Sequence, residues 1–155
     1  MSNSLLATVY YDVYQENFSS ADFSKRVKMQ KLVYLLQEAG IPLGDYSFFW
    51  YKHGPYCQKL QDDILYSSST NIERIHYSDN ASRILSKLKE LFQIKTAYNQ
   101  TQWVECLASL QYLRSNVFGN EAKQKDIISK LELLKPHLNN TDVNNFAFQK
   151  LQEVL

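Results

Sequence analysis

The residues with the most obvious chemical potential are a cysteine and a histidine four positions apart, Cys57 and His53. A thiol attacks as the thiolate, and the start of a helix beside a base favours that form. The strongest enzymatic hypothesis that this pair allows is a Cys57-based hydrolase. However, Cys57 shares a helical side with Leu60 and Ile64, and no Asn or Asp is evident that would orient the base. We therefore favour packing for this thiol and assign no catalytic residue; the hydrolase is a remote alternative.

Metal and phosphate sites are not indicated by the spacing of the other reactive side chains. His53, His76 and His137 are isolated in the sequence, and neither cysteine has a partner at ligand spacing. Asp62 and Asp63 are adjacent, so on a helix they point about 100° apart and cannot share a face. The sequence lacks GxxxxGK[ST] and GxGxxG, and it has only 4 glycines for a phosphate-binding loop. We expect neither a metal nor a cofactor.

Length and composition predict one folded domain over residues 1–155. Hydrophobic residues make up 45% of the chain and charged residues 21%, which is typical of a globular protein. The aromatic fraction, 14% with 11 tyrosines, is the unusual value. Exposed tyrosines often mark contact surfaces, because they provide a large contact area at low entropic cost. For any single tyrosine we favour half-buried packing with the hydroxyl in water.

The charge and cysteine content favour a cytoplasmic protein without a membrane partner. The formal net charge is +1, so no global field attracts nucleic acid or an anionic membrane. Cys57 and Cys106 are far apart and flanked by apolar residues, which indicates reduced thiols. The first residues have no basic n-region, and no apolar run approaches the roughly 18 residues of a membrane span.

Seven segments have apolar residues at helical spacing or clear helix boundaries. The segments 32–36 and 103–118 are apolar on most sides, which predicts two central helices. The other helices are expected to be amphipathic, with Leu134 and Phe146 among their inward residues. Expected caps are Asp22 or Ser20, a residue within 78–80, and Thr141 or Asn140. The predicted helices are 4–15, about 22–39, from Pro55 to about 67, about 80–92, 103–118, 126–134 and 141–154.

Two short segments are predicted to be strands that pair beside the helices. The aromatic run from Tyr46 to Tyr51 has strand composition, and so does Ile72 to Tyr77. Between them, Gly54-Pro55 is expected to open a helix, with proline at the first helical position. The predicted fold class is therefore mainly α: a compact bundle of about seven helices with a two-stranded antiparallel wing, which is winged-helix-like.

A winged helix suggests a DNA-binding regulator as the alternative function. Two basic runs would contact phosphates. Against this stand the near-neutral charge and two aspartates, Asp62 and Asp63, on the expected recognition helix. The two runs are Lys25, Arg26, Lys28 and Lys31, and Arg83, Lys87 and Lys89.

Two motifs carry a resemblance to a known family. The first is Lys28-Met29-Gln30-Lys31-Leu32-Val33-Tyr34, and the second is Trp50-Tyr51-Lys52-His53-Gly54-Pro55-Tyr56, followed by Leu60 and Asp63. Over residues 22–66 the chain resembles the YwgA-like and Panacea-domain proteins, which are similar to the antitoxin half of the SocAB system. These proteins share a Lys-x-x-Lys-Leu-x-Tyr helix, a short strand and a Gly-Pro turn.

The resemblance implies a non-enzymatic module that binds and neutralises a partner protein in a bacterial or phage toxin–antitoxin or defence context. The partner would be the product of a neighbouring gene, with nucleic acid as the less favoured alternative. The chain departs from the family pattern at two positions. His53 replaces a Tyr, which would alter a contact made there, and Cys57 replaces a small hydroxyl residue. The residues expected to bind the partner are Tyr51, Lys52, His53, Tyr56, Lys28 and Lys31. Those expected to be structural are Tyr34, Gly54, Pro55 and Trp50.

Overall fold

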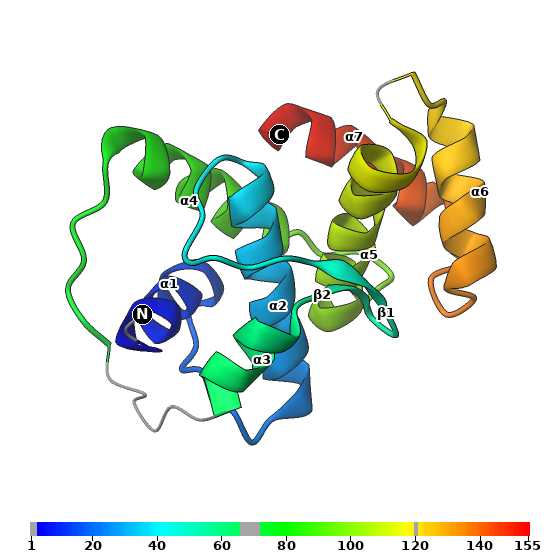
Figure 1. Ribbon diagram of the computed structural model, residues 1–155. Coiled ribbons are helices and arrows are strands. Elements are labelled where there is room, and N and C mark those ends of the chain that lie inside the picture. Colours follow the sequence, from blue (N-terminus) through cyan, green and yellow to red (C-terminus); the bar gives the residue numbers. More distant parts are fainter. Residues whose placement is uncertain (1–2, 66–71, 120) are drawn as a thin grey trace.

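The computed structural model describes residues 3–65, 72–119 and 121–155. Within these ranges the chain forms seven α-helices, one π-helical segment and one two-stranded sheet (Figure 1). The predicted mainly α fold with an antiparallel wing is confirmed. The elements are α1 (Asn3–Tyr14), α2 (Phe23–Glu38), β1 (Phe49–Tyr51), β2 (Gly54–Tyr56), α3 (Gln58–Leu65), α4 (Asp79–Phe92), α5 (Gln100–Tyr112), η1 (Leu113–Phe118), α6 (Gln124–Leu134) and α7 (Thr141–Val154).

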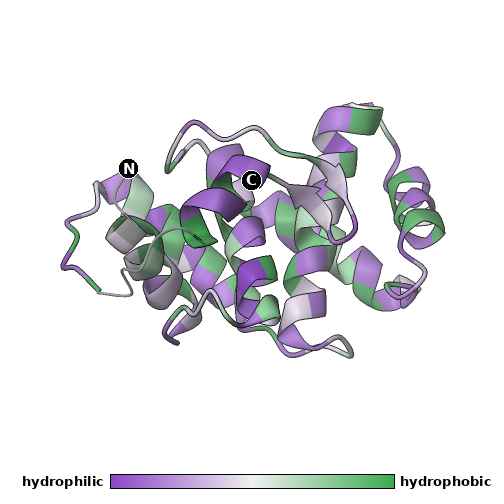
Figure 2. Ribbon diagram, turned by 60° about the horizontal axis from the view of Figure 1, so that its bottom comes forward, coloured by the Kyte–Doolittle hydropathy of each residue, from purple (hydrophilic) through white to green (hydrophobic). Residues whose placement is uncertain are grey.

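Two helices, α2 and α5, form the centre of the molecule and pack against each other. Every residue from Val27 to Leu36 in α2 is buried, as is every residue from Trp103 to Gln111 in α5. The central helix predicted around 32–36 is therefore confirmed. The one predicted over 103–118 is confirmed as far as Leu113, beyond which the π-helical segment η1 is mostly exposed. Hydrophobic and hydrophilic positions alternate along the outer helices in Figure 2, as expected for elements with one buried face.

Local capping chemistry sets most of the helix starts. Asp22 accepts a hydrogen bond from the backbone N–H of Lys25, and Ser78 and Asn140 cap α4 and α7 in the same way. Asn99 caps α5 in a capping box with Gln102, an arrangement that the sequence prediction missed. Each cap satisfies N–H groups that have no partner inside the helix.

Two residues predicted to point inward are exposed instead. Phe146 and Leu134 are both at the surface. In α7 the buried stripe consists of Asn144, Ala147, Phe148 and Leu151, so the helix is rotated relative to the expected face. The reason is polar: the Asn144 side chain is buried and donates to Leu138 O at 2.9 Å, which draws its side of the helix inward.

The prediction that Ile72–Tyr77 forms the second strand is wrong. The partner of β1 is β2, with Phe49 opposite Tyr56 and Tyr51 opposite Gly54. The sheet is thus a local hairpin closed by Lys52 and His53, and short-range closure costs less entropy than pairing with a distant segment.

Residues 72–77 run instead along α1 and hydrogen-bond to its side chains. The backbone N–H of Glu73 donates to Thr8 Oγ1 at 2.8 Å, and the Tyr77 hydroxyl donates to Asp12 Oδ2 at 2.5 Å. The Thr8 hydroxyl thus satisfies one backbone N–H of this segment, and the Tyr77–Asp12 bond ties the segment to α1 through side chains.

The prediction that Pro55 opens a helix is wrong. Pro55 lies in β2, opposite Trp50. The next helix begins three residues later, at Gln58. Proline suits this strand because β2 is an edge strand. The missing N–H of Pro55 therefore leaves no hydrogen bond to a further strand unmade. The predicted end of that helix, at about residue 67, lies outside the described residues.

Candidate functional site

The hairpin formed by β1 and β2 rests on two buried lysine side chains. Lys31 Nζ, from α2, donates to the carbonyl oxygen of Pro55 at 2.8 Å. Lys135 Nζ, from the end of α6, donates to Tyr51 O at 2.9 Å and also to Lys52 O. Charge-assisted hydrogen bonds to backbone carbonyls are strong, so the turn is held in one conformation from below.

Glu105 on α5 is the carboxylate that faces these lysines. It is buried, and its carboxylate oxygens lie 2.9 Å from His137 Nε2, 3.5 Å from His53 Nδ1 and 3.9 Å from Lys135 Nζ. We call this set the Lys31 cluster; it consists of Lys31, Lys135, Glu105, His53 and His137. Two lysines thus share one buried carboxylate, so the cluster has an excess of cationic groups.

Burial has a marked effect on the ionisation of the two lysines. It lowers the pKa of Lys31 to about 7, with Glu105 opposing the shift and Lys135 adding to it. Burial also lowers the pKa of Lys135, again against the attraction of Glu105. The direction follows from desolvation, which disfavours the charged amine, and Glu105 compensates for this only in part.

Gly54 permits the hairpin to lie directly on α5. Its φ of +89° is in the region that favours glycine. A Cβ at this position would also overlap with Ser109 Oγ of α5, an atom without a hydrogen bond among the described residues. The predicted structural role of Gly54 thus has two physical causes, backbone conformation and close approach.

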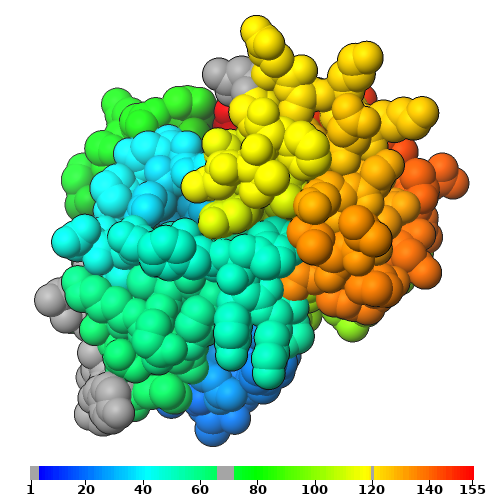
Figure 3. Space-filling view, turned by 45° about the vertical axis from the view of Figure 1, so that its right-hand side comes forward, coloured from blue at the N-terminus to red at the C-terminus, as the bar shows by residue number. Residues whose placement is uncertain are grey.

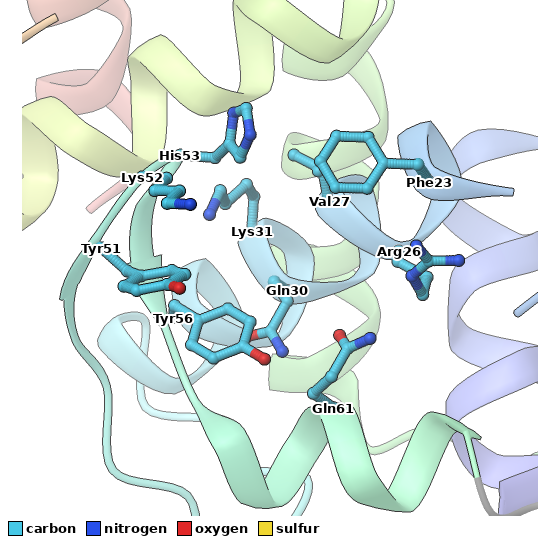
Figure 4. Close-up of a pocket in the computed structure, with 10 residues that line it drawn as sticks. All are labelled: Phe23, Arg26, Val27, Gln30, Lys31, Tyr51, Lys52, His53, Tyr56 and Gln61. Atoms are coloured by element: carbon cyan, nitrogen blue, oxygen red, sulfur yellow. The ribbon is translucent and has the colours of Figure 1, made fainter.

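A pocket of about 390 Å³ opens between this hairpin and the N-terminal half of α2 (Figure 4). Lys31 reaches it from the floor, between His53 and Tyr51. Figure 3 shows the teal hairpin segment at the molecular surface, between blue residues near the start of α2 and the orange α6 region. The lining residues are Phe23, Arg26, Val27, Gln30, Lys31, Tyr51, Lys52, His53, Tyr56 and Gln61.

Aromatic side chains are exposed around this pocket. Phe49 and Tyr51 are two residues apart on β1, so their side chains share one side of the hairpin. Tyr56 lies opposite Phe49 on that side. Their exposed fractions are 68% for Phe49 and 53% for Tyr51, and Phe23 across the pocket is 56% exposed. We call Phe23, Phe49, Tyr51 and Tyr56 the aromatic face.

Of the residues predicted to bind a partner, the structure brings Tyr51, Lys52, His53, Tyr56 and Lys31 together around the pocket. Tyr51 and Lys52 are exposed and His53 is half-buried at the surface. Lys31 differs from expectation, because it is buried beneath the hairpin rather than displayed. Whether these residues bind a partner stays a prediction.

Lys28, by contrast, does not line this pocket, and its role in binding a partner stays a prediction. It is buried, with Nζ 2.9 Å from Glu16 Oε2, 2.9 Å from Gln100 Oε1 and 4.7 Å from the centre of the Tyr14 ring. We call Lys28, Glu16, Gln100, Tyr14 and Tyr10 the Lys28 cluster; Tyr10 also donates to Glu16. A carboxylate and an amide satisfy this lysine inside the protein.

The first basic run is therefore not a continuous exposed surface. Its remaining members, Lys25 and Arg26, are half-buried and donate to backbone carbonyls of Asn17 and Ser20, each at 2.6 Å. This arrangement leaves little of the run free for phosphate contacts along a duplex.

Two residues expected to be structural, Tyr34 and Trp50, pack against neighbouring rings. Tyr34 is buried with its ring centre 5.2 Å from that of Phe48. Trp50, on the opposite side of the hairpin from Tyr51, lies 5.7 Å from the Tyr112 ring and 5.1 Å from Lys135 Nζ. These contacts fix the hairpin from its inner side.

Cys57 is buried and integrated into the backbone network. Its N–H donates to Gln30 Oε1 at 2.9 Å, and Gln30 Nε2 donates to its carbonyl at 3.0 Å. The His53 ring contacts Glu105 and the Phe23 ring, which lies 5.2 Å away, and no contact joins it to the thiol. In the described part of the chain no group of His, Cys, Asp and Glu side chains is arranged to hold a metal.

Sequence reasoning did not single out four residues that lie in the pocket lining or the Lys31 cluster: Glu105, Lys135, Phe23 and Gln30. Glu105 did leave a signal, since it is a lone carboxylate within the apolar run Trp103–Leu110. Lys135, at the end of α6, left none, because a lysine at a helix end is ordinarily solvated.

Comparisons with protein-family models, curated proteins and solved structures yielded no match to this chain. The likeness to YwgA-like and Panacea-domain proteins thus stays a prediction based on the two motifs. Among the described helices, none is both long and apolar enough to cross a membrane.

Proposed function

We propose that this chain is a non-enzymatic, cytoplasmic protein-interaction module that binds a partner protein through the aromatic face, in the manner of an antitoxin. The observation that supports this most is the pair of exposed aromatic side chains, Phe49 and Tyr51, on a hairpin held rigidly by Lys31 and Lys135.

Rigidity matters because binding costs conformational entropy. An aromatic side chain on a fixed hairpin has little freedom left to lose, so more of its contact energy contributes to affinity. Exposed aromatics on a fixed scaffold are typical of binding hot spots. The mixed lining of the pocket behind them, with basic and aromatic groups, adds selectivity for a partner that presents acidic and apolar groups.

The test is co-expression with the product of the adjacent gene. We expect a stable complex, or relief of the toxicity of that product. Phe49→Ala and Tyr51→Ala should each weaken the complex roughly 30-fold, equivalent to about 2 kcal/mol. Phe146→Ala, which removes an exposed ring from α7, is the matched control and should leave affinity unchanged.

A neighbour that is innocuous alone and never co-purifies would contradict the antitoxin-like role. If a complex forms but Phe49→Ala and Phe146→Ala behave alike, the partner binds elsewhere on the molecule.

A further inference from the structure

The charged side chains that line the pocket beside the hairpin are all basic. Three of its lining residues have cationic side chains, Arg26, Lys31 and Lys52, and His53 adds a fourth basic group. No carboxylate is present among its lining residues. A concave surface of one sign concentrates ligands of the opposite charge.

Lys31 is the group on which an anion would be centred. Its side chain is 1% exposed, and Figure 4 shows its amine directed into the pocket between Tyr51 and His53. An ammonium has three N–H donors, and among the described residues Lys31 uses one, toward Pro55 O. The counter-charge that Glu105 provides is shared with Lys135, His137 and His53. The remaining donors can therefore serve a ligand.

The walls of the pocket suit a flat ring. The Tyr51 and Tyr56 rings lie 5.1 Å apart between centroids, and Phe23 stands on the far side of the pocket from them (Figure 4). Arg26 contributes a planar cation beside Phe23, with 5.5 Å from Cζ to the ring centre. Aromatic and guanidinium planes stack on nucleobases with little dependence on sequence.

One amide in the lining is available for hydrogen bonds to a ring edge. Both polar atoms of the Gln30 side chain are occupied by the Cys57 backbone. Gln61, in contrast, lines the pocket without a hydrogen bond from its side chain to any described residue. An amide offers both donors and an acceptor, which matches the mixed edge of a base.

From these observations we propose that the pocket binds a nucleoside monophosphate group, with the phosphate at Lys31, Lys52 and His53 and the base against Tyr51 and Tyr56. A phosphate monoester carries about −1.5 to −2 charges and three acceptor oxygens, so it matches several cations better than a single carboxylate does. The volume of about 390 Å³ is within the range of small-molecule sites. This inference does not depend on the proposed partner protein.

The same group can belong to a free nucleotide or to the 5′ end of a nucleic acid, and titration calorimetry distinguishes them. The ligands are AMP, adenosine, inorganic phosphate and a 5′-phosphorylated hexanucleotide. We expect AMP to bind at least tenfold more tightly than adenosine or phosphate alone. A hexanucleotide that binds more tightly than AMP assigns the site to a strand end, and equal or weaker binding assigns it to the free nucleotide.

Variants locate the site. Lys31→Met should lower the affinity for AMP at least tenfold, and Lys52→Met and Tyr51→Leu at least threefold. The latter two residues are exposed, so these proteins should fold even if Lys31→Met does not. Lys59→Met, which removes a nearby charge outside the lining, is the control and should bind normally.

Two results would overturn the proposal: no binding of AMP, or equal affinity for AMP and adenosine. Equal losses in Lys52→Met and Lys59→Met would also overturn it, since they would indicate a diffuse charge effect rather than a pocket.

Discussion

The two buried lysines of α2 lie less than one turn apart, and their surroundings differ in how completely each amine is paired within the protein. Lys28 is satisfied within the protein by Glu16, Gln100 and the Tyr14 ring. Lys31 donates to one backbone carbonyl, shares a single carboxylate with another lysine, and opens onto a pocket. A saturated buried charge contributes to the fold alone, whereas an incompletely paired one retains capacity for a ligand.

Among the variants that test this contrast, removal of the shared carboxylate should lower the free energy of unfolding most. Glu105→Gln leaves Lys31 and Lys135 without their counter-charge, and breaking a buried pair in this way costs about 3–5 kcal/mol. The free energy of unfolding, measured by urea denaturation, checks this value. A loss below about 1 kcal/mol would show that the Lys31 cluster is solvated and not electrostatically strained.

A substitution where the hairpin closely approaches α5 should give the next largest loss of stability. Gly54→Ala should destabilise the protein by roughly 2–4 kcal/mol, because left-handed strain adds to an overlap with Ser109. Gly40→Ala is the control: its φ is +91° but no atom lies within 4 Å, so it should show the strain alone, about 1–2 kcal/mol.

The double variant Gly54→Ala/Ser109→Ala separates the two causes. It removes Ser109 Oγ and leaves Ser109 Cβ at an ordinary 3.6 Å from the new Cβ. Its additional cost relative to Ser109→Ala should therefore fall to that of Gly40→Ala. No such recovery would mean that the backbone conformation accounts for the whole effect.

The ionisation of Lys31 predicts an effect on stability that depends on pH. Its pKa is about 7 in the folded protein and 10.5 in the unfolded chain, so between these values the unfolded state binds more protons. Stability should therefore rise with pH from 7 toward 9, by up to about 1.4 kcal/mol per pH unit. Below pH 7 this contribution should be constant.

Thermal or urea unfolding at pH 7, 8 and 9 measures this slope. Lys31→Met should remove most of it, while Lys28→Met should retain it. Equal slopes in the two variants would contradict the distinction between the clusters. Above pH 9 the rise should weaken, because burial raises the pKa of Cys106 and the unfolded chain loses that proton first. Above pH 10 the trend should reverse, because burial also raises the pKa of Tyr14 and Tyr34.

The smallest effect is expected at the partner of Lys28. Glu16→Gln should cost less than about 1 kcal/mol, since its side chain is 34% exposed and the Gln100 contact to Lys28 remains. Urea denaturation beside Glu105→Gln gives the comparison directly. Similar losses in the two variants would show that both clusters depend on their carboxylates to the same degree.

The helical part of the fold was predictable because its signals are local. Asp22, Ser78 and Asn140 cap helices as their residue types suggest, and the apolar runs of α2 and α5 are central. The pairing of the hairpin was not predictable from strand propensity. Ile72–Tyr77 has strand composition, but a turn of two residues after Tyr51 provides a nearer partner.

The site was predictable only in its exposed half. The aromatic and basic residues from Tyr51 to Tyr56 are visible as a motif, and they do gather around one pocket. The burial of Lys28 and Lys31 depends on Glu16, Gln100 and Glu105, which come from other elements. No pattern within α2 specifies those partners, since a basic run ordinarily indicates a solvated face.

The two lysine anchors of the hairpin come from positions 31 and 135, more than 100 residues apart in the sequence. During synthesis, the first helices, the hairpin and α5 leave the ribosome well before the second anchor does. A nascent or truncated chain that stops short of Lys135 would therefore lack the support beneath Tyr51 and Lys52. The hairpin is therefore expected to reach its final order late, after the residues that form its strands are already in place.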